Sequence, residues 1–187
     1  MLIILITLTT AIAVLTALVF LVPRQVRYAE RIRIAAPVAS VYDAVRFQKD
    51  LMRWSAWPSA TQSTCATENT DGEVGARTVF FSKGKRFGYQ EVTALEPDRR
   101  VDIALTSAGP PQKPRITYAF EPAGPNATIV TLHWTNEITR PFNVALRLLG
   151  IVRWTRAMHL KDLDGLRRFC EPPHQTYTGE PARAQSA

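Results

Sequence analysis

Apolar and polar side chains alternate along this chain with two different periods, and the places where the period changes mark the expected elements. Between residues 26 and 34 the apolar positions share one parity and the basic positions the other, namely Val26, Tyr28, Ile32 and Ile34 against Arg27, Arg31 and Arg33. This alternation is typical of a half-buried strand. After Pro37 the apolar residues recur every three or four positions up to Val45, which predicts a short amphipathic helix and, after a break, a second one around Trp54.

The middle of the chain, from Thr61 to Asn136, returns to a strand pattern that is interrupted by turn sequences. These turns are Asp71-Gly72, Lys83-Gly84-Lys85, Glu96-Pro97-Asp98, Gly109-Pro110-Pro111 and Gly124-Pro125-Asn126. Six antiparallel strands fit between and around them. Residues 142–171 contain no proline and carry apolar side chains near helical spacing, which predicts one long amphipathic helix with Gly150 as a tolerated interruption.

The order of elements is therefore one strand, two short helices, six strands and one long helix, which indicates an α+β fold. A sheet of seven antiparallel strands twists strongly, so we expect a curved sheet that wraps around the long C-terminal helix and is closed by helices. The interior of such a grip is either filled by side chains or left as a pocket, and the sequence leaves both alternatives open.

An uncharged segment precedes this folded part. Leu2–Val22 contains no charge, glycine or proline, and Pro23 follows it. At about 1.5 Å per residue a helix of this length crosses a hydrocarbon core of about 30 Å. A secretory signal peptide is the competing interpretation, but it requires a basic n-region and a cleavage site of small residues, whereas Met1 is followed directly by apolar residues. We therefore expect an uncleaved, single-pass transmembrane anchor.

Basic residues decide the expected orientation. The segment behind the anchor contains Arg24, Arg27, Arg31 and Arg33 against the single acid Glu30, so the positive-inside rule places the domain in the cytoplasm. The whole chain has 23 Lys+Arg and 16 Asp+Glu, a formal net charge of +7. This charge points to an anionic partner such as a membrane surface or a nucleic acid.

The 187 residues divide into an anchor at 1–23, one folded domain at 24–171 and a tail at 172–187. A content of 46% hydrophobic and 21% charged residues is ordinary for a globular protein and excludes a mainly disordered, collagen-like or disulfide-rich chain. Pro172-Pro173 closes the last helical pattern, and the polar residues that follow have no periodicity, which predicts a disordered tail.

Several stretches, taken in order, resemble the START/polyketide cyclase-like (SRPBCC) superfamily. They are IRIAAPVASVYDAV at 32–45, Trp54-Ser55-Ala56-Trp57, the step Gly72-Glu73-Val74-Gly75-Ala76 into a strand, and the closing amphipathic helix. The resemblance covers residues 24–171 and is closer to the membrane-anchored members, which place one span directly before the first strand. It implies a helix-grip fold with a hydrophobic cavity for lipids, polyketides or other apolar small molecules. Only some members are catalytic, and they share no catalytic motif that transfers to this sequence.

Motifs for metal, phosphate and hydrolase chemistry are absent from the sequence. The histidines lie on different elements and the two cysteines, Cys65 and Cys170, are far apart, so we expect no metal site and no cofactor. No phosphate-binding loop and no Gly-x-Ser-x-Gly motif is present. The two thiols are expected to be inert core groups in a reducing cytoplasm, with a disulfide only if the domain faces outward.

Strand parity predicts which side chains face the interior. Three sets each share a face: Val101, Ile103 and Leu105; Ile116, Tyr118 and Phe120; Val130, Leu132 and Trp134. The candidate cavity residues from these strands are Ile103, Leu105, Tyr118 and Trp134, to which the helical region adds Trp54. The aromatic residues among them are expected to be chiefly core, with ligand stacking as a second role. His133 has the opposite parity and is expected outside.

The segment from Phe87 to Leu95 contains the acid of greatest interest. One parity holds Phe87, Tyr89 and Leu95 together with Glu91, so an inward orientation of this face makes Tyr89 and Glu91 cavity residues. Burial would then favour the neutral form of the carboxyl unless Lys or Arg pairs with it. Two alternatives are together favoured: a bulge turns Glu91 to water, or the opposite parity, with Val92, faces inward.

On the predicted C-terminal helix an apolar stripe includes two titratable residues. Its members recur at spacings of three and four and are Val152, Arg156, His159, Leu163 and Leu166. In a pocket, Arg156 would hold a ligand carboxylate or phosphate and His159 would transfer a proton. The favoured interpretation is that both side chains extend to water at the edge of the stripe.

Three functions fit these features. The first, which we favour, is a membrane-tethered module that binds a lipid or another hydrophobic small molecule beside the bilayer, with the basic residues toward an anionic leaflet. The second is an enzyme of cyclase or dehydratase type with Glu91, Tyr89 or His159 as acid and base. The third is a module that binds a nucleic acid or a protein partner. No nucleic acid is expected, because the arginines are spread without interleaved aromatic residues or a recognition motif.

Overall fold

The computed structural model describes residues 1–171, so the predicted disordered tail at 172–187 lies outside the described residues. The strands are β1 (Gln25–Ile34), β2 (Thr64–Glu68), β3 (Arg77–Ser82), β4 (Lys85–Glu96), β5 (Arg100–Ser107), β6 (Gln112–Pro122) and β7 (Thr128–Ile138). The helices are α1 (Leu2–Leu21), α2 (Val38–Arg46), α3 (Leu51–Trp54), α4 (Trp57–Ala60), α5 (Phe142–Leu148) and α6 (Ile151–Cys170), with a 3-10 turn η1 (Gln48–Asp50). This order confirms the predicted α+β fold.

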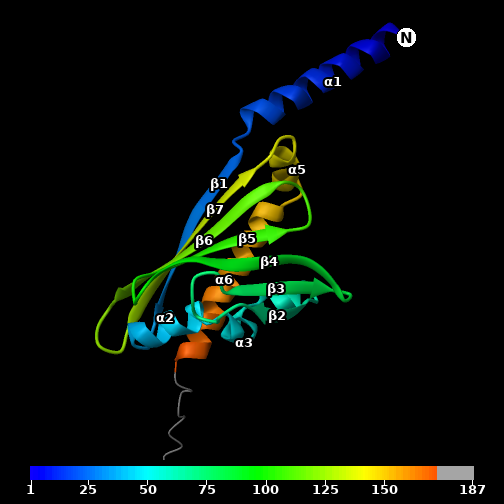
Figure 1. Cartoon of the computed structure of the whole chain (residues 1–187). Helices are drawn as coiled ribbons and strands as arrows, with labels where there is room; N and C mark the ends of the chain where they lie inside the picture. Colours follow the sequence, from blue (N-terminus) through cyan, green and yellow to red (C-terminus); the bar gives the residue numbers. More distant parts are fainter. Residues whose placement is uncertain (172–187) are drawn as a thin grey trace, which may run out of the picture.

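The strands form one antiparallel sheet in the order β1-β7-β6-β5-β4-β3-β2. Consecutive strands from β2 to β7 are neighbours, and β1 pairs with β7, with Tyr28 opposite Trp134. Register shifts in β3 and β4, between Phe80 and Phe81 and between Val92 and Ala94, interrupt the ladder. Such irregularities bend a sheet, and the curved sheet wraps around α6 (Figure 1).

The helix α6 lies against β1 and against the short helices α2 and α3, which close the end of the sheet opposite α1 (Figure 1). The contact between α3 and α6 depends on Gly165. A Cβ atom at this position would lie 2.0 Å from the carbonyl oxygen of Trp54, so the close approach of the two helices requires glycine.

The prediction of one continuous helix over residues 142–171 is wrong. Gly150 adopts a left-handed conformation with φ of 71°, which ends α5 and starts α6 in a new direction. The chain between the two helices, which we call the elbow (residues 148–151), exposes 78% of Leu148 and 73% of Leu149. The break therefore exposes these apolar side chains to solvent. A continuous amphipathic helix would instead direct them to its buried stripe.

The core confirms the predicted strand parities on β5, β6 and β7. Buried inward residues of these strands are Val101, Ile103, Ile116, Tyr118, Phe120, Val130, Leu132 and Trp134. His133 is exposed, as expected. Together with Ile34, Val41 and Leu166 these side chains form one continuous hydrophobic cluster between the sheet and the helices.

The helix α1 is long and apolar enough to cross a membrane, with a mean hydropathy of 2.7 and no buried residue. A membrane span and a signal sequence both have this length and composition. Its end is attached to α5: Nδ2 of Asn143 donates to the carbonyl oxygens of Val19 and Val22 at 3.2 and 2.9 Å. Arg147 donates to the carbonyl oxygens of Pro23 and Gln25. The last carbonyl groups of α1 are thus bonded to side chains of the domain.

Candidate ligand-binding cavity

A cavity of about 290 Å³ lies between the concave face of the sheet and the helices. Its wall is predominantly apolar and is formed by β1, by β3 to β7, by the region from the end of α2 to α4, by α5 and by α6 as far as Asp162. The apolar lining side chains include Val26, Leu51, Trp54, Phe80, Ile103, Leu105, Ile116, Tyr118, Trp134, Ile138, Leu146 and Val152. The interior of the grip is therefore partly open, which decides between the two alternatives that the sequence left.

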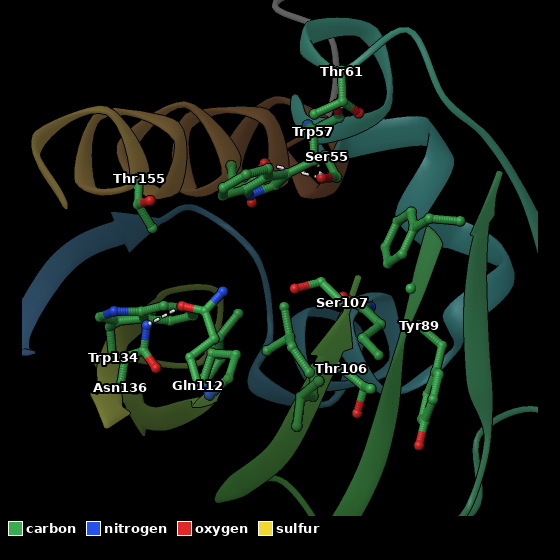
Figure 2. Close-up of a pocket in the computed structure, with 18 of the residues that line it drawn as sticks. Ser55, Trp57, Thr61, Tyr89, Thr106, Ser107, Gln112, Trp134, Asn136 and Thr155 are labelled. Carbon is green, nitrogen blue, oxygen red and sulfur yellow. Dashed lines mark hydrogen bonds between the residues drawn. The ribbon is translucent and has the colours of Figure 1, made fainter. Parts of the chain in front are cut away.

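Polar side chains interrupt this wall on two opposite sides (Figure 2). From the helical side come Ser55, Thr155 and Asp162, and from the sheet come Gln90, Ser107, Gln112 and Asn136. Of the described residues that line the cavity, none is Lys, Arg or His. The only acidic side chain among these lining residues is therefore that of Asp162, and the wall offers no cation.

Asp162 is a buried carboxyl on α6, with 3% of its surface exposed. Its Oδ1 accepts hydrogen bonds from Oγ of Ser55 at 3.0 Å and from the backbone N–H of Ala56 at 2.7 Å. Burial raises the pKa of Asp162 from 3.8 to about 7, although these hydrogen bonds act in the opposite direction. The arrangement joins α6 to the segment between α3 and α4, and it gives the cavity wall one group that titrates near neutral pH.

His159 lies behind the wall rather than in it. Its Nδ1 shares a hydrogen bond of 2.8 Å with the hydroxyl of Tyr28, and its ring packs 4.7 Å from that of Trp134 and 5.8 Å from that of Trp57. Burial lowers the pKa of His159 to about 4, and burial together with Glu30 raises the pKa of Tyr28. His159 is therefore neutral at pH 7 and supports two tryptophans that line the cavity. The expectation that it extends to water is wrong.

The inward orientation that would make Tyr89 and Glu91 cavity residues does not occur, and the favoured alternative, in which Val92 faces inward, is confirmed. Gln90 and Val92 are buried on the inner face of β4, whereas Glu91 forms an ion pair of 2.7 Å with Arg77 on the outer face. The ring of Tyr89 points away from the cavity, between the guanidinium groups of Arg77 and Arg86 (Figure 2). Tyr89 is among the residues next to the cavity, but its ring is not directed into it (Figure 2).

Arg156 does not line the cavity either. It forms an ion pair with Glu30 at the surface, and its guanidinium group lies 5.7 Å from the centre of the Tyr28 ring. This agrees with the favoured interpretation that the side chain extends to water from the edge of the stripe. The geometry thus brings together Trp54, Ile103, Leu105, Tyr118 and Trp134 around the cavity and leaves Glu91, Arg156 and His159 outside its lining.

The polar residues of the wall were not among the sequence candidates, although two of them follow the patterns used to find the others. Asn136 has the parity of Trp134 on β7, and Asp162 follows His159 by three positions on the α6 stripe. The signal was present in both places. Because a polar residue does not add to an apolar pattern, only the surrounding structure shows that these two face the cavity.

Metal chemistry has no obvious site in the described part of the chain. Among residues 1–171, no three His, Cys, Asp or Glu side chains come together as possible metal ligands. Cys65 and Cys170 are free and half-buried, and burial is the main cause that raises the pKa of each thiol to about 11.

The curved seven-stranded sheet, the long helix in its grip and the apolar cavity define a helix-grip domain of the SRPBCC type. The chain belongs to the family described as "Polyketide cyclase / dehydrase and lipid transport", which matches residues 25–171. This match coincides with the folded domain expected at 24–171 and confirms the resemblance seen in the sequence. No curated protein matches the chain by sequence.

Solved structures show the same fold at low sequence identity. Protein CV1439 from Chromobacterium violaceum is 19% identical, with a TM-score of 0.54 over 80% of this chain and 98% of its own. Norcoclaurine synthase from Thalictrum flavum is 12% identical, with a TM-score of 0.58 over 78% and 92% of the two chains. Ginseng major latex-like protein 151 from Panax ginseng is 12% identical, with a TM-score of 0.54 over 80% and 99%. At these identities the similarity concerns the fold alone.

Proposed function

We propose that this protein is a membrane-tethered module that binds a lipid or another hydrophobic small molecule in its internal cavity. The observation that carries the proposal is the apolar cavity of about 290 Å³ at the centre of the domain. Cavities that take small molecules are lined mainly by apolar and aromatic side chains with a few placed polar groups, and this wall has that composition. The family description, which includes lipid transport, supports a hydrophobic ligand.

The tether is supported by the way α1 meets the domain. Asn143 of α5 binds the end of α1, Arg147 binds the segment that directly follows it, and their neighbour Leu146 lines the cavity. The cavity wall and the end of the anchor therefore share one short helix. With α1 in a bilayer, this attachment holds the cavity beside the membrane, where a hydrophobic ligand is concentrated. The arginines behind α1 favour the cytoplasmic side.

The elbow adds a second feature that suits a membrane surface. Leu148, Leu149 and Ile151 are exposed, as is Trp154, and Ile151 and Trp154 also line the cavity. Arg147 and Arg153 flank Leu148, Leu149 and Ile151 in the sequence, and Trp154 follows Arg153. Exposed apolar residues next to arginines are typical of segments that lie in the interface of a bilayer with anionic lipids.

A second candidate function is a proton-transfer enzyme of cyclase or dehydratase type, and one observation favours it. Asp162 is a cavity carboxyl whose pKa is raised to about 7, so it both accepts and donates a proton near neutral pH. Norcoclaurine synthase, which has the same fold, has been solved in complex with dopamine and hydroxybenzaldehyde. In this chain the acid-base residue would be Asp162, because Glu91 and Tyr89 point away from the cavity.

The test is native mass spectrometry of the full chain extracted from membranes of its own host, followed by organic extraction of the bound material. A binding module is expected to carry one apolar molecule per chain, and Asp162→Asn is expected to retain it. An enzyme is expected to lose turnover of the identified molecule in Asp162→Asn. A chain that carries nothing, and takes up none of the extracted host lipids, would contradict both functions.

A further inference from the structure

The sheet side of the cavity contains a pair of amides with an unused hydrogen-bonding atom. Asn136 on β7 is 7% exposed, and its Nδ2 donates to Oε1 of Gln112 on β6 at 2.9 Å. Its Oδ1 is buried and has no partner among the described residues. Figure 2 shows the two amides side by side at the cavity, next to Trp134. A buried amide oxygen without a partner is unfavourable and is rare in folded proteins.

The fold does not need an amide at this position. The preceding inward residues of β7 are Val130, Leu132 and Trp134, all buried and apolar. A leucine at position 136 has nearly the same size as asparagine and would remove the unpaired oxygen, although the half-buried side chain of Gln112 would lose the hydrogen bond from Asn136. The other buried amide of the wall, Gln90, is bonded to Oε1 of Gln48 at 2.7 Å. Asn136 therefore differs from its neighbours on β7 and from the other wall amide, since one of its two polar atoms has no partner among the described residues.

The charge of the wall restricts what this ligand can be. The lining contains one carboxyl, Asp162, and none of its described residues is a Lys, Arg or His. A carboxylate or phosphate taken into the cavity would therefore be desolvated without a counter-ion, which is strongly unfavourable. An anionic headgroup is excluded from the cavity on this ground.

We propose that Asn136 and Gln112 form a polar subsite that binds a hydroxyl group of an uncharged, otherwise apolar ligand. The proposal rests on the binding function proposed above and specifies its ligand class. A carboxamide turned by 180° exchanges its oxygen and its NH₂ group, and a hydroxyl both donates and accepts, so it satisfies the subsite in either orientation. Apolar alcohols and phenols meet these conditions, whereas fatty acids and phospholipid headgroups do not.

The experiment uses the full chain in phosphatidylcholine nanodiscs and three probes of similar shape: 2-naphthol, 2-methylnaphthalene and 2-naphthoate. Calorimetric titration gives each affinity after subtraction of the heat from empty nanodiscs. We expect 2-naphthol to bind the wild type about ten-fold more tightly than 2-naphthoate. Asn136→Leu is expected to weaken the binding of 2-naphthol about ten-fold and to leave the affinity for 2-methylnaphthalene unchanged or higher. Partition of a probe into lipid cancels when variants are compared, and for the comparison between probes the free concentration is corrected by the partition of each probe measured with empty nanodiscs.

Thr106→Val is the matched control, since it replaces an exposed polar side chain on the outer face of β5, opposite Tyr89, with an apolar one of the same shape. It is expected to leave the affinity ratio of 2-naphthol to 2-methylnaphthalene unchanged. If Asn136→Leu alters the two affinities equally, or if 2-naphthoate binds the wild type as tightly as 2-naphthol, the subsite proposal is wrong while the binding function stands. If no probe binds above the empty nanodisc, the binding function itself fails. The wild-type comparison needs no variant, so it holds even if Asn136→Leu does not fold.

Discussion

The two ends of the sheet differ in what occupies the space over its concave face. Toward α2 the inward positions carry Val101 on β5 and Leu132 on β7, both fully buried in the hydrophobic cluster. Toward α1 the inward positions of the same strands carry Ser107 and Asn136, which line the cavity. One set of strands thus builds a solid core at one end and a hollow at the other.

The cavity at the α1 end of the sheet has two causes, the small side chains on β4 and β5 and the interruption of the C-terminal helix at Gly150. On β4, Gly88 lies opposite Ser107, and a Cβ at Gly88 would meet the carbonyl oxygen of Thr106 at 2.5 Å. Glycine is therefore required at position 88, and together with the small Ser107 it leaves the space above these two strands empty. On the helical side Gly150 ends α5, so the elbow turns Leu148 and Leu149 to the surface instead of over the sheet. Stability and binding are consequently expected to depend on opposite ends of the molecule.

The largest expected effect is a matched pair of leucine truncations. Leu132→Ala at the filled end removes a fully buried side chain and is expected to lower the free energy of unfolding by about 4 kcal/mol. Leu105 at the cavity end is half-buried and borders an existing space, so Leu105→Ala is expected to lower the free energy of unfolding by only about 1 kcal/mol. Urea unfolding of the full chain in detergent, followed by tryptophan fluorescence, measures both. Equal losses would show that the two ends are packed alike.

The second prediction separates two buried groups on α6 by pH. The pKa of Asp162 is raised from 3.8 to about 7, so the fold loses stability as the pH rises through this range. The pKa of His159 is lowered from 6.5 to about 4, so the fold loses stability as the pH falls through that range. In the wild type the two effects oppose each other. In Asp162→Asn the free energy of unfolding is expected to fall by about 3 kcal/mol as the pH is lowered, because only His159 still titrates. In His159→Gln it is expected to fall by about 3 kcal/mol as the pH is raised toward 7, because only Asp162 still titrates. Urea unfolding between pH 4 and 7 measures these slopes, and parallel slopes in the two variants would contradict the assignment.

The smallest effect on stability is expected at the elbow. Leu149→Cys should change the free energy of unfolding by less than about 0.5 kcal/mol, since the side chain is exposed. A fluorophore attached there in nanodiscs with anionic lipid is expected to be quenched by brominated lipid, because the elbow follows directly on the residues that bind the end of α1. Cys65 and Cys170 should react slowly, since burial raises the pKa of both thiols.

Leu160→Cys is the matched control for this labelling. Leu160 is also exposed on α6, about 14 Å further along the helix from the elbow. A label at this position is expected to escape quenching. Equal quenching at both positions, or none at either, would show that the elbow does not rest on the bilayer.

The sequence predicts the fold where strands are regular. On β5, β6 and β7 strict alternation placed Ile103, Tyr118 and Trp134 inside, and the structure agrees. On β4 the parity that groups Glu91 with Leu95 does not hold, because the irregularity between Val92 and Ala94 brings Leu95 to the same face as Val92, as the favoured alternative for Glu91 expects. A bulge shifts the parity of a strand without any mark in its hydrophobic pattern.

The cavity itself was harder to predict than its apolar wall. Asn136 and Asp162 owe their roles to partners far away in the chain, Gln112 for the first and Ser55 with Ala56 for the second. Periodicity reports the face on which a residue lies, but it does not report whether that face meets another side chain or an empty space. The helix break at Gly150 was missed for a related reason, since glycine is compatible with both a continued and an ended helix.

The central claim is that the hollow end of the sheet holds a hydrophobic ligand, and a matched pair of tryptophan substitutions tests it most directly. Leu105→Trp fills the cavity from β5, whereas Leu160→Trp adds the same bulk on the exposed side of α6. Native mass spectrometry of both variants, purified from the host beside the wild type, gives the fraction of chains that carry the apolar molecule. We expect Leu160→Trp to retain the molecule at the wild-type level and folded Leu105→Trp to lose it. Retention of the same molecule by folded Leu105→Trp would contradict the account.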